Sequence, residues 1–187
     1  MEGRKAKTAF ELAMEKVAEM PKLNSEEIKE EHKKAYIVKG EAIAHHYLQN
    51  IHRKTNISNE ISAFDSEHMV YARDAALECL SRELGLTNPE ISRHILEGVA
   101  ALNPNIQIDA ALARLNQIIA DYHKELLAAY SSLEKTEVKN LKIKGISGSA
   151  VKPNLKAHNS WHKEQAELTV SHTRKLRIFQ KSLLLQK

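Results

Sequence analysis

Apolar residues recur at spacings of three and four through most of this chain, and that spacing is the period of an α-helix. The longest regular series predicts a helix over residues 109–141, and its members are Leu112, Leu115, Ile119, Tyr122, Leu126, Ala129 and Leu133. Residues at this spacing share one side of a helix, as in the seam of a coiled coil. We therefore expect a long helix that either crosses its own bundle or pairs with another copy.

A second series of the same kind lies near the end of the chain. It predicts an amphipathic helix over residues 160–187, with the stripe Trp161, Gln165, Leu168, His172, Leu176, Phe179 and Leu183. Gln165 and His172 weaken this stripe as a buried seam, but polar members of a seam can fix its register. An undocked helix would expose a large apolar stripe, so we expect it to dock on its own chain or on a sister subunit.

Breakers and caps divide the first part of the chain into further helices. Thr8 and Glu11 have the spacing of a capping box, and they begin a helix that Pro21 ends. A second helix is predicted over residues 24–53. It contains Gly40, which costs about 1 kcal/mol relative to alanine inside a helix. Either the surrounding residues compensate for this cost, or a neighbouring helix approaches closely at that point.

The middle of the chain contains two more predicted helices. Residues 55–59 are expected to form a loop, and the helix that follows ends at Leu84. Gly85 is a natural left-handed terminator for that helix. Pro89 is a start signal at the first position of the next helix, which is predicted over residues 89–102.

The composition fits an all-helical chain. The 187 residues include six glycines, four prolines and 5% aromatic residues, so most of the chain can be helical and its core must be largely aliphatic. The predicted fold is all-α, with an antiparallel bundle of about five helices over residues 1–141. An extended connector over residues 142–159 then leads to a basic amphipathic helix over residues 160–187. The length allows one domain with an appendage.

The net charge changes sign along the chain. Residues 1–138 contain 17 Lys and Arg against 22 Asp and Glu, a net charge of −5, whereas residues 139–187 contain 11 against 2, a net charge of +9. A basic segment can bind phosphates, lie on an anionic membrane or dock on an acidic protein surface. The apolar stripe favours a protein surface, because phosphate contacts alone would leave that stripe exposed.

The sequence therefore predicts a non-enzymatic interaction or scaffold protein. It is expected to form a homo-oligomer through its long helices and to offer its C-terminal helix to a protein partner. No residue is assigned a catalytic role, and no cofactor is expected. The expected interaction residues are the central seam and the docking anchors, namely Leu115, Ile119, Tyr122, Leu126, Trp161, Leu168, Leu176 and Phe179.

The segment 80–96 gives a nucleic-acid-binding alternative. Residues 80–93 read Leu-Ser-Arg-Glu-Leu-Gly-Leu-Thr-Asn-Pro-Glu-Ile-Ser-Arg, with a turn glycine between two predicted helices. This segment resembles the helix-turn-helix of bacterial DNA-binding regulators. The resemblance implies that the second helix lies in a major groove, with the basic tail adding phosphate contacts. The nucleic-acid-binding residues under this alternative are Ser92, Arg93, Arg174, Lys175 and Arg177.

Ten histidines suggest a second alternative, a metal-binding helical bundle. A histidine and a carboxylate three or four residues apart lie on the same side of a helix. Asp65 and His68 have the first spacing, and Glu41 and His45 have the second. The di-iron bundles use Glu-x-x-His pairs, and no histidine of this chain has a glutamate three residues before it.

Nothing in the sequence predicts export or membrane insertion. The single cysteine, Cys79, cannot form an internal disulfide, and its apolar neighbours are typical of a small core residue. The N-terminal residues lack the apolar run of a signal peptide. No stretch approaches the ~18 apolar residues of a membrane-spanning helix. We therefore expect a cytoplasmic protein.

Overall fold

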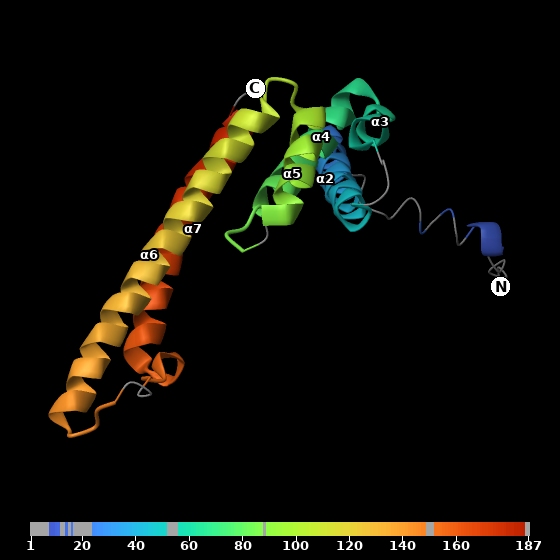
Figure 1. Cartoon of the computed structure of the whole chain (residues 1–187). Coiled ribbons are helices and arrows are strands. Elements are labelled where there is room, and N and C mark those ends of the chain that lie inside the picture. The colour runs from blue at the N-terminus through green and yellow to red at the C-terminus, as the bar shows by residue number, and fades with distance from the viewer. Residues whose placement is uncertain are drawn as a thin grey trace, which may run out of the picture. The chain divides into compact units, whose positions relative to one another are not determined.

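The computed structural model describes residues 8–11, 14, 16, 24–51, 56–87, 89–148 and 152–185. All regular structure in these ranges is helical (Figure 1), which confirms the predicted all-α class. The helices are α2 (Ser25–Gln49), α3 (Ile57–Ser62), α4 (Ser66–Arg82), α5 (Pro89–Leu102), α6 (Ile108–Ile143), the 3-10 turn η1 (Leu155–Ala157) and α7 (Asn159–Leu185). None of these described helices is long and apolar enough to cross a membrane. The chain divides into two compact units, Met1–Ala35 and Tyr36–Lys187.

Capping boxes mark two helix starts in the first unit. The Thr8 hydroxyl accepts a hydrogen bond from the Glu11 backbone N–H (3.3 Å), and the Glu11 carboxylate accepts one from the Thr8 N–H (2.8 Å), as predicted. Most of the helix that should follow lies outside the described residues. Asn24 and Glu27 form the same reciprocal pair, with both distances 2.8 Å. This pair satisfies two backbone donors that a helix start leaves free, and α2 begins there.

Two glycines let helices of the second unit approach each other closely. A Cβ atom at Gly40 in α2 would overlap the backbone of Ala72 in α4. At Gly98 in α5, an added Cβ would lie 2.6 Å from the ring of Tyr47. The Tyr47 hydroxyl donates a hydrogen bond to the carbonyl oxygen of His94, also in α5, at 3.0 Å. Of the two explanations for Gly40, the close approach of a neighbouring helix is therefore confirmed, and α4 is that helix.

The loop predicted over residues 55–59 is wrong from residue 57 onward, where α3 begins, and residue 55 lies outside the described residues. The Asn56 side chain accepts a hydrogen bond from the Ser58 N–H at 3.2 Å and caps α3. Ile57 and Ile61 are four residues apart in α3, and both are buried. Burial of these two side chains against α4 and α5 stabilises a helix too short to form alone. The asparagine acts as a helix cap here and not as a loop residue.

Helices α6 and α7 lie side by side over most of their length (Figure 1). Successive contacts join later residues of α6 to earlier residues of α7, so the two helices run in opposite directions. The contacting pairs are Glu137–His158, Tyr130–Trp161, Tyr122–Thr169 and Arg114–Phe179. We call residues 108–185 the α6–α7 hairpin.

The segment between these two helices folds back onto its own chain. Helix α6 continues to Ile143, and Gly145 and Gly148 then adopt φ angles of 79° and 147°, which glycine reaches without steric cost. Leu155 in η1 is buried, with 1% of its surface exposed, and η1 contacts both α6 and α7. The predicted extended connector therefore ends in a buried turn.

The end of α7 completes the hydrophobic core. Phe179 and Leu183 belong to the same cluster of buried residues as Leu96 of α5. The Gln180 side chain also donates a hydrogen bond to the backbone carbonyl oxygen of Leu84 at 3.0 Å. Because one turn of α7 supplies core side chains and a polar tether, α7 is part of the folded unit and not an appendage to it.

Candidate interaction surface

The eight predicted interaction residues lie at contacts within one chain. Leu115, Ile119 and Tyr122 on α6, and Trp161, Leu176 and Phe179 on α7, are buried, while Leu126 and Leu168 are partly buried and pack against the core. We call this line of contact between the two helices the seam. A sister subunit could reach the buried members of this set only if the hairpin opened. In the single chain, these residues therefore contact their own helices, as expected for a long helix that crosses its own bundle.

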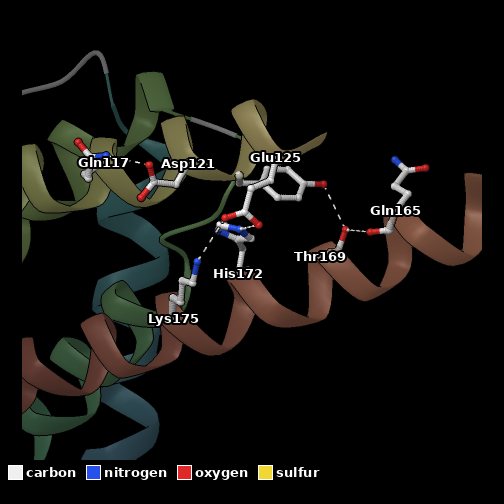
Figure 2. A network of polar contacts seen from close by, with 8 residues as sticks. Gln117, Asp121, Glu125, Gln165, Thr169, His172 and Lys175 are labelled. Atoms are coloured by element: carbon white, nitrogen blue, oxygen red, sulfur yellow. Dashed lines mark hydrogen bonds and ion pairs between the residues drawn. The ribbon is translucent and has the colours of Figure 1, made fainter. Parts of the chain in front are cut away.

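A polar network occupies the middle of the seam (Figure 2). The fully buried His172 lies with its Nε2 3.0 Å from a carboxylate oxygen of Glu125, and Lys175 Nζ lies 3.8 Å from the other oxygen. The Tyr122 and Thr169 hydroxyls are 3.1 Å apart, and Thr169 donates to the carbonyl oxygen of Gln165 at 2.7 Å. Polar groups at single seam positions favour the one alignment in which they are paired.

The geometry of this network explains the acidity of Glu125. The hydrogen bond with His172 lowers the pKa of Glu125 below its ordinary value, and the nearby positive charge of Lys175 adds to this effect. The second ring nitrogen of His172, Nδ1, is buried and has no hydrogen-bond partner among the residues that the structure describes. An unpaired buried polar atom of this kind costs free energy. His172 therefore pairs with Glu125 of α6 through Nε2 alone.

A different side of α7 faces solvent and carries both apolar and basic residues. Val170, Ile178 and Leu185 are 64%, 59% and 80% exposed. Arg174 and Lys181 are exposed on the same side of the helix, at spacings of three and four from these residues. We call these five residues the outer face of α7. Sequence reasoning named Arg174 only as a nucleic-acid-binding candidate. It missed this face as a unit because the stronger buried stripe dominates the pattern, although a second three-and-four series is present in the same segment.

The residues of the nucleic-acid-binding alternative do not form one surface feature. Ser92 is fully buried, so its side chain does not face solvent, and Arg93 lies 3.5 Å from the carboxylate of Asp109. Arg174, Lys175 and Arg177 are exposed on α7.

The link between α4 and α5 also differs from a helix-turn-helix. Six residues, 83–88, separate Arg82 and Pro89 at the ends of the two helices, whereas the motif uses a turn of about three or four. Among the described residues, positive φ angles occur only at Gly145 and Gly148. The left-handed conformation expected at Gly85 is therefore wrong, and α4 ends earlier, at Arg82.

Only two of the four metal-binding candidates, Asp65 and His68, contact each other among the described residues. His68 Nδ1 lies 2.7 Å from the carboxylate of Asp65, which caps α4, and this hydrogen bond lowers the pKa of Asp65. His45 lies near Cys79 instead, with 3.7 Å between Nε2 and Sγ. Burial raises the pKa of the Cys79 thiol. Over the part of the chain that the structure describes, no three or more His, Cys, Asp or Glu residues are arranged to hold a metal ion. Glu41 is therefore not part of such a group either.

Comparisons with protein-family models, with curated proteins and with solved structures found no match to this chain.

Proposed function

We propose that this chain is a non-enzymatic helical interaction protein, and that the outer face of α7 is its contact surface. One observation carries the proposal. The strong apolar seam is used within the chain, and yet the same helix keeps Val170, Ile178 and Leu185 largely exposed to solvent. A surface helix needs no aliphatic residues on its solvent side, where polar helix formers serve equally well.

The spacing of the exposed residues supports a helix-sized contact. From Val170 to Leu185 the outer face advances by four, four, three and four residues, which keeps all five side chains on one line over four turns. Covering exposed aliphatic surface contributes roughly 25 cal/mol per Å². A partner lying along this line would cover all three exposed aliphatic side chains at once.

Self-association remains part of the proposal, but it is assigned to different residues. The predicted seam residues would have to separate before they could contact another copy, whereas Ile178 and Leu185 need no rearrangement. A second copy and a different protein are both suitable occupants of an exposed helix face.

Site-specific photocrosslinking tests whether this face is used. A benzophenone amino acid would replace Ile178 in the full chain inside its native cells, and a matched variant would carry it at Lys139, which is exposed on α6. We expect a discrete adduct from position 178 and none from position 139. An adduct of twice the 21.1 kDa chain mass would identify a second copy. No adduct at position 178, or equal products from both positions, would refute the proposal.

A further inference from the structure

Apolar and basic side chains alternate along the outer face of α7. Ile178 and Leu185 are seven residues apart, and Arg174 and Lys181 are also seven apart and fall between them. Two residue types that repeat every seven positions form the layers by which helices pair side by side. The face therefore presents layers of aliphatic and positively charged side chains in turn.

The positive charges on this face have no acidic neighbours on their own helix. From residue 168 to the end of the chain there is no Asp or Glu. Lys175 lies 3.8 Å from Glu125 on α6, whereas Arg174 and Lys181 have no ion pair within the described residues. Charges that remain unneutralised on a surface attract and orient a partner of opposite sign.

A hollow adjoins the C-terminal end of the face. It measures about 380 Å³ and is lined by Leu184 and Leu185 of α7 and by Asp74, Leu77 and Glu78 of α4. The leucines of this hollow can hold one large apolar side chain of the kind that often anchors a protein interface, whereas Asp74 and Glu78 would repel a carboxylate placed there. Leu185 belongs both to the hollow and to the outer face, so one partner could contact the two together.

We infer that the outer face of α7 binds an acidic amphipathic helix of another protein, one with aliphatic residues every seven positions and Asp or Glu between them. This inference rests on the proposed function and adds the chemistry of the partner. The aliphatic residues of such a helix would pack on Ile178 and Leu185, and its carboxylates would pair with Arg174 and Lys181.

The other anionic partners fit this surface less well. A nucleic acid would neutralise Arg174 and Lys181 but would leave Ile178 and Leu185 without apolar contact. An anionic membrane would take the aliphatic residues into its apolar layer. Arg174 and Lys181 lie on the same line between them, so their side chains would have to bend away from the apolar layer to reach the headgroups. An acidic amphipathic helix satisfies both kinds of side chain at the same time.

Binding of a synthetic peptide tests the inference. The probe is a fluorescent helix-forming peptide with leucine at every seventh position and glutamate midway between leucines, titrated with the full chain and followed by anisotropy. We expect saturable binding. Affinity should fall roughly tenfold or more in the double variant Arg174→Glu/Lys181→Glu, because each attraction becomes a repulsion. It should also fall in Ile178→Gln, which removes an aliphatic contact and keeps a good helix former.

Matched controls make the result specific. Lys139→Glu changes charge by the same amount per residue at an exposed position on α6 and should bind like the wild type. A peptide of the same composition with its leucines out of register should bind at least roughly tenfold more weakly. Circular dichroism establishes that each variant is folded, and Ile178→Gln provides the test if the double variant is not.

Several outcomes would overturn the inference. They are no binding of the peptide, equal binding of the out-of-register peptide, equal binding by the double variant, and tighter binding of oligothymidylate or of phosphatidylserine vesicles than of the peptide. If position 178 forms a discrete crosslink in cells while the peptide does not bind, the contact surface stands and the acidic helix is wrong. If both experiments fail, the proposed function fails as well.

Discussion

At the scale of single residues, one missing methyl group sets the distance between α2 and α4. Gly40 faces the backbone of Ala72, and backbone cannot move aside as a flexible side chain can. Glycine lowers the stability of α2 relative to alanine, but the Cβ atom of alanine would force α2 and α4 apart. The sequence pointed to either this contact or local compensation, and the structure decides between them.

We predict that Gly40→Ala destabilises the protein by about 1–3 kcal/mol, as expected for overpacking. The higher helix propensity of alanine would act in the opposite direction by about 1 kcal/mol. Urea unfolding followed by circular dichroism measures the difference. Gly85→Ala is the matched control, since its nearest neighbouring atom lies 3.9 Å from the added Cβ and its φ is not positive. A Gly40→Ala chain as stable as the wild type would contradict the close approach.

We also predict that Glu125 makes stability sensitive to acid. Its pKa is lowered from 4.5 in the folded chain, chiefly by the hydrogen bond with His172. A lowered folded pKa stabilises the fold above the unfolded value, and this contribution is lost as the pH falls through the folded value. The urea midpoint should therefore drop below pH 4.5, and it should drop less in Glu125→Gln. Glu164→Gln, an exposed change of equal charge on α7, should retain the wild-type profile. An unchanged profile in Glu125→Gln would refute the assignment.

At the scale of elements, α7 has two sides with different roles. Phe179 is 2% exposed and Ile178 is 59% exposed, although the two are consecutive in the sequence. A helix turns by about 100° per residue, and this turn separates a core residue from a surface residue. Stability and binding are therefore assigned to different side chains of one helix.

Alanine substitutions at these two neighbours should differ sharply. Phe179→Ala removes a buried ring and should cost about 3–5 kcal/mol. Ile178→Ala changes an exposed position and should cost less than about 0.5 kcal/mol. Urea unfolding of the two variants under the same conditions measures both values. Similar losses in the two variants would mean that the orientation of α7 is wrong.

The sequence predicts helices well where a long amphipathic pattern is present, as in α6 and α7, because periodicity extends over many turns. It fails at α3, where six residues are too few for periodicity and Asn56 serves equally as a cap or a turn residue. The outer face of α7 was missed for a different reason. An apolar residue on the solvent side is recognised only when the buried side is known, and a single sequence does not identify what covers each stripe.

At the scale of the whole molecule, α7 and the rest of the second unit depend on each other. Helix α7 covers the apolar stripe of α6, and its last turns complete the core formed with α4 and α5. The change of charge near residue 139 first suggests a separate basic arm. The burial of His172, Leu176 and Phe179 shows instead that this arm is structural on one side.

We predict that a chain ended after Leu141 is poorly soluble and unfolds without a cooperative transition. The truncation exposes Leu115, Ile119 and Tyr122 and removes core side chains. Thermal unfolding and light scattering measure the effect. A synthetic peptide of residues 152–185, added during refolding, should restore solubility because it supplies the missing cover. A soluble, cooperatively folding truncated chain would contradict this dependence.

The hydrogen bond from Gln180 to the Leu84 carbonyl joins residues 96 positions apart in the chain. At a synthesis rate of about 5–20 residues per second, the partner of α4 follows after roughly 5–20 s. During that interval α4 is complete and α5 and α6 are synthesised, but the helix that covers their apolar sides is not yet finished. The nascent chain therefore passes through a period in which its future core is open to other proteins. We expect chaperone demand in the cell to depend on the rate at which residues 85–180 are translated.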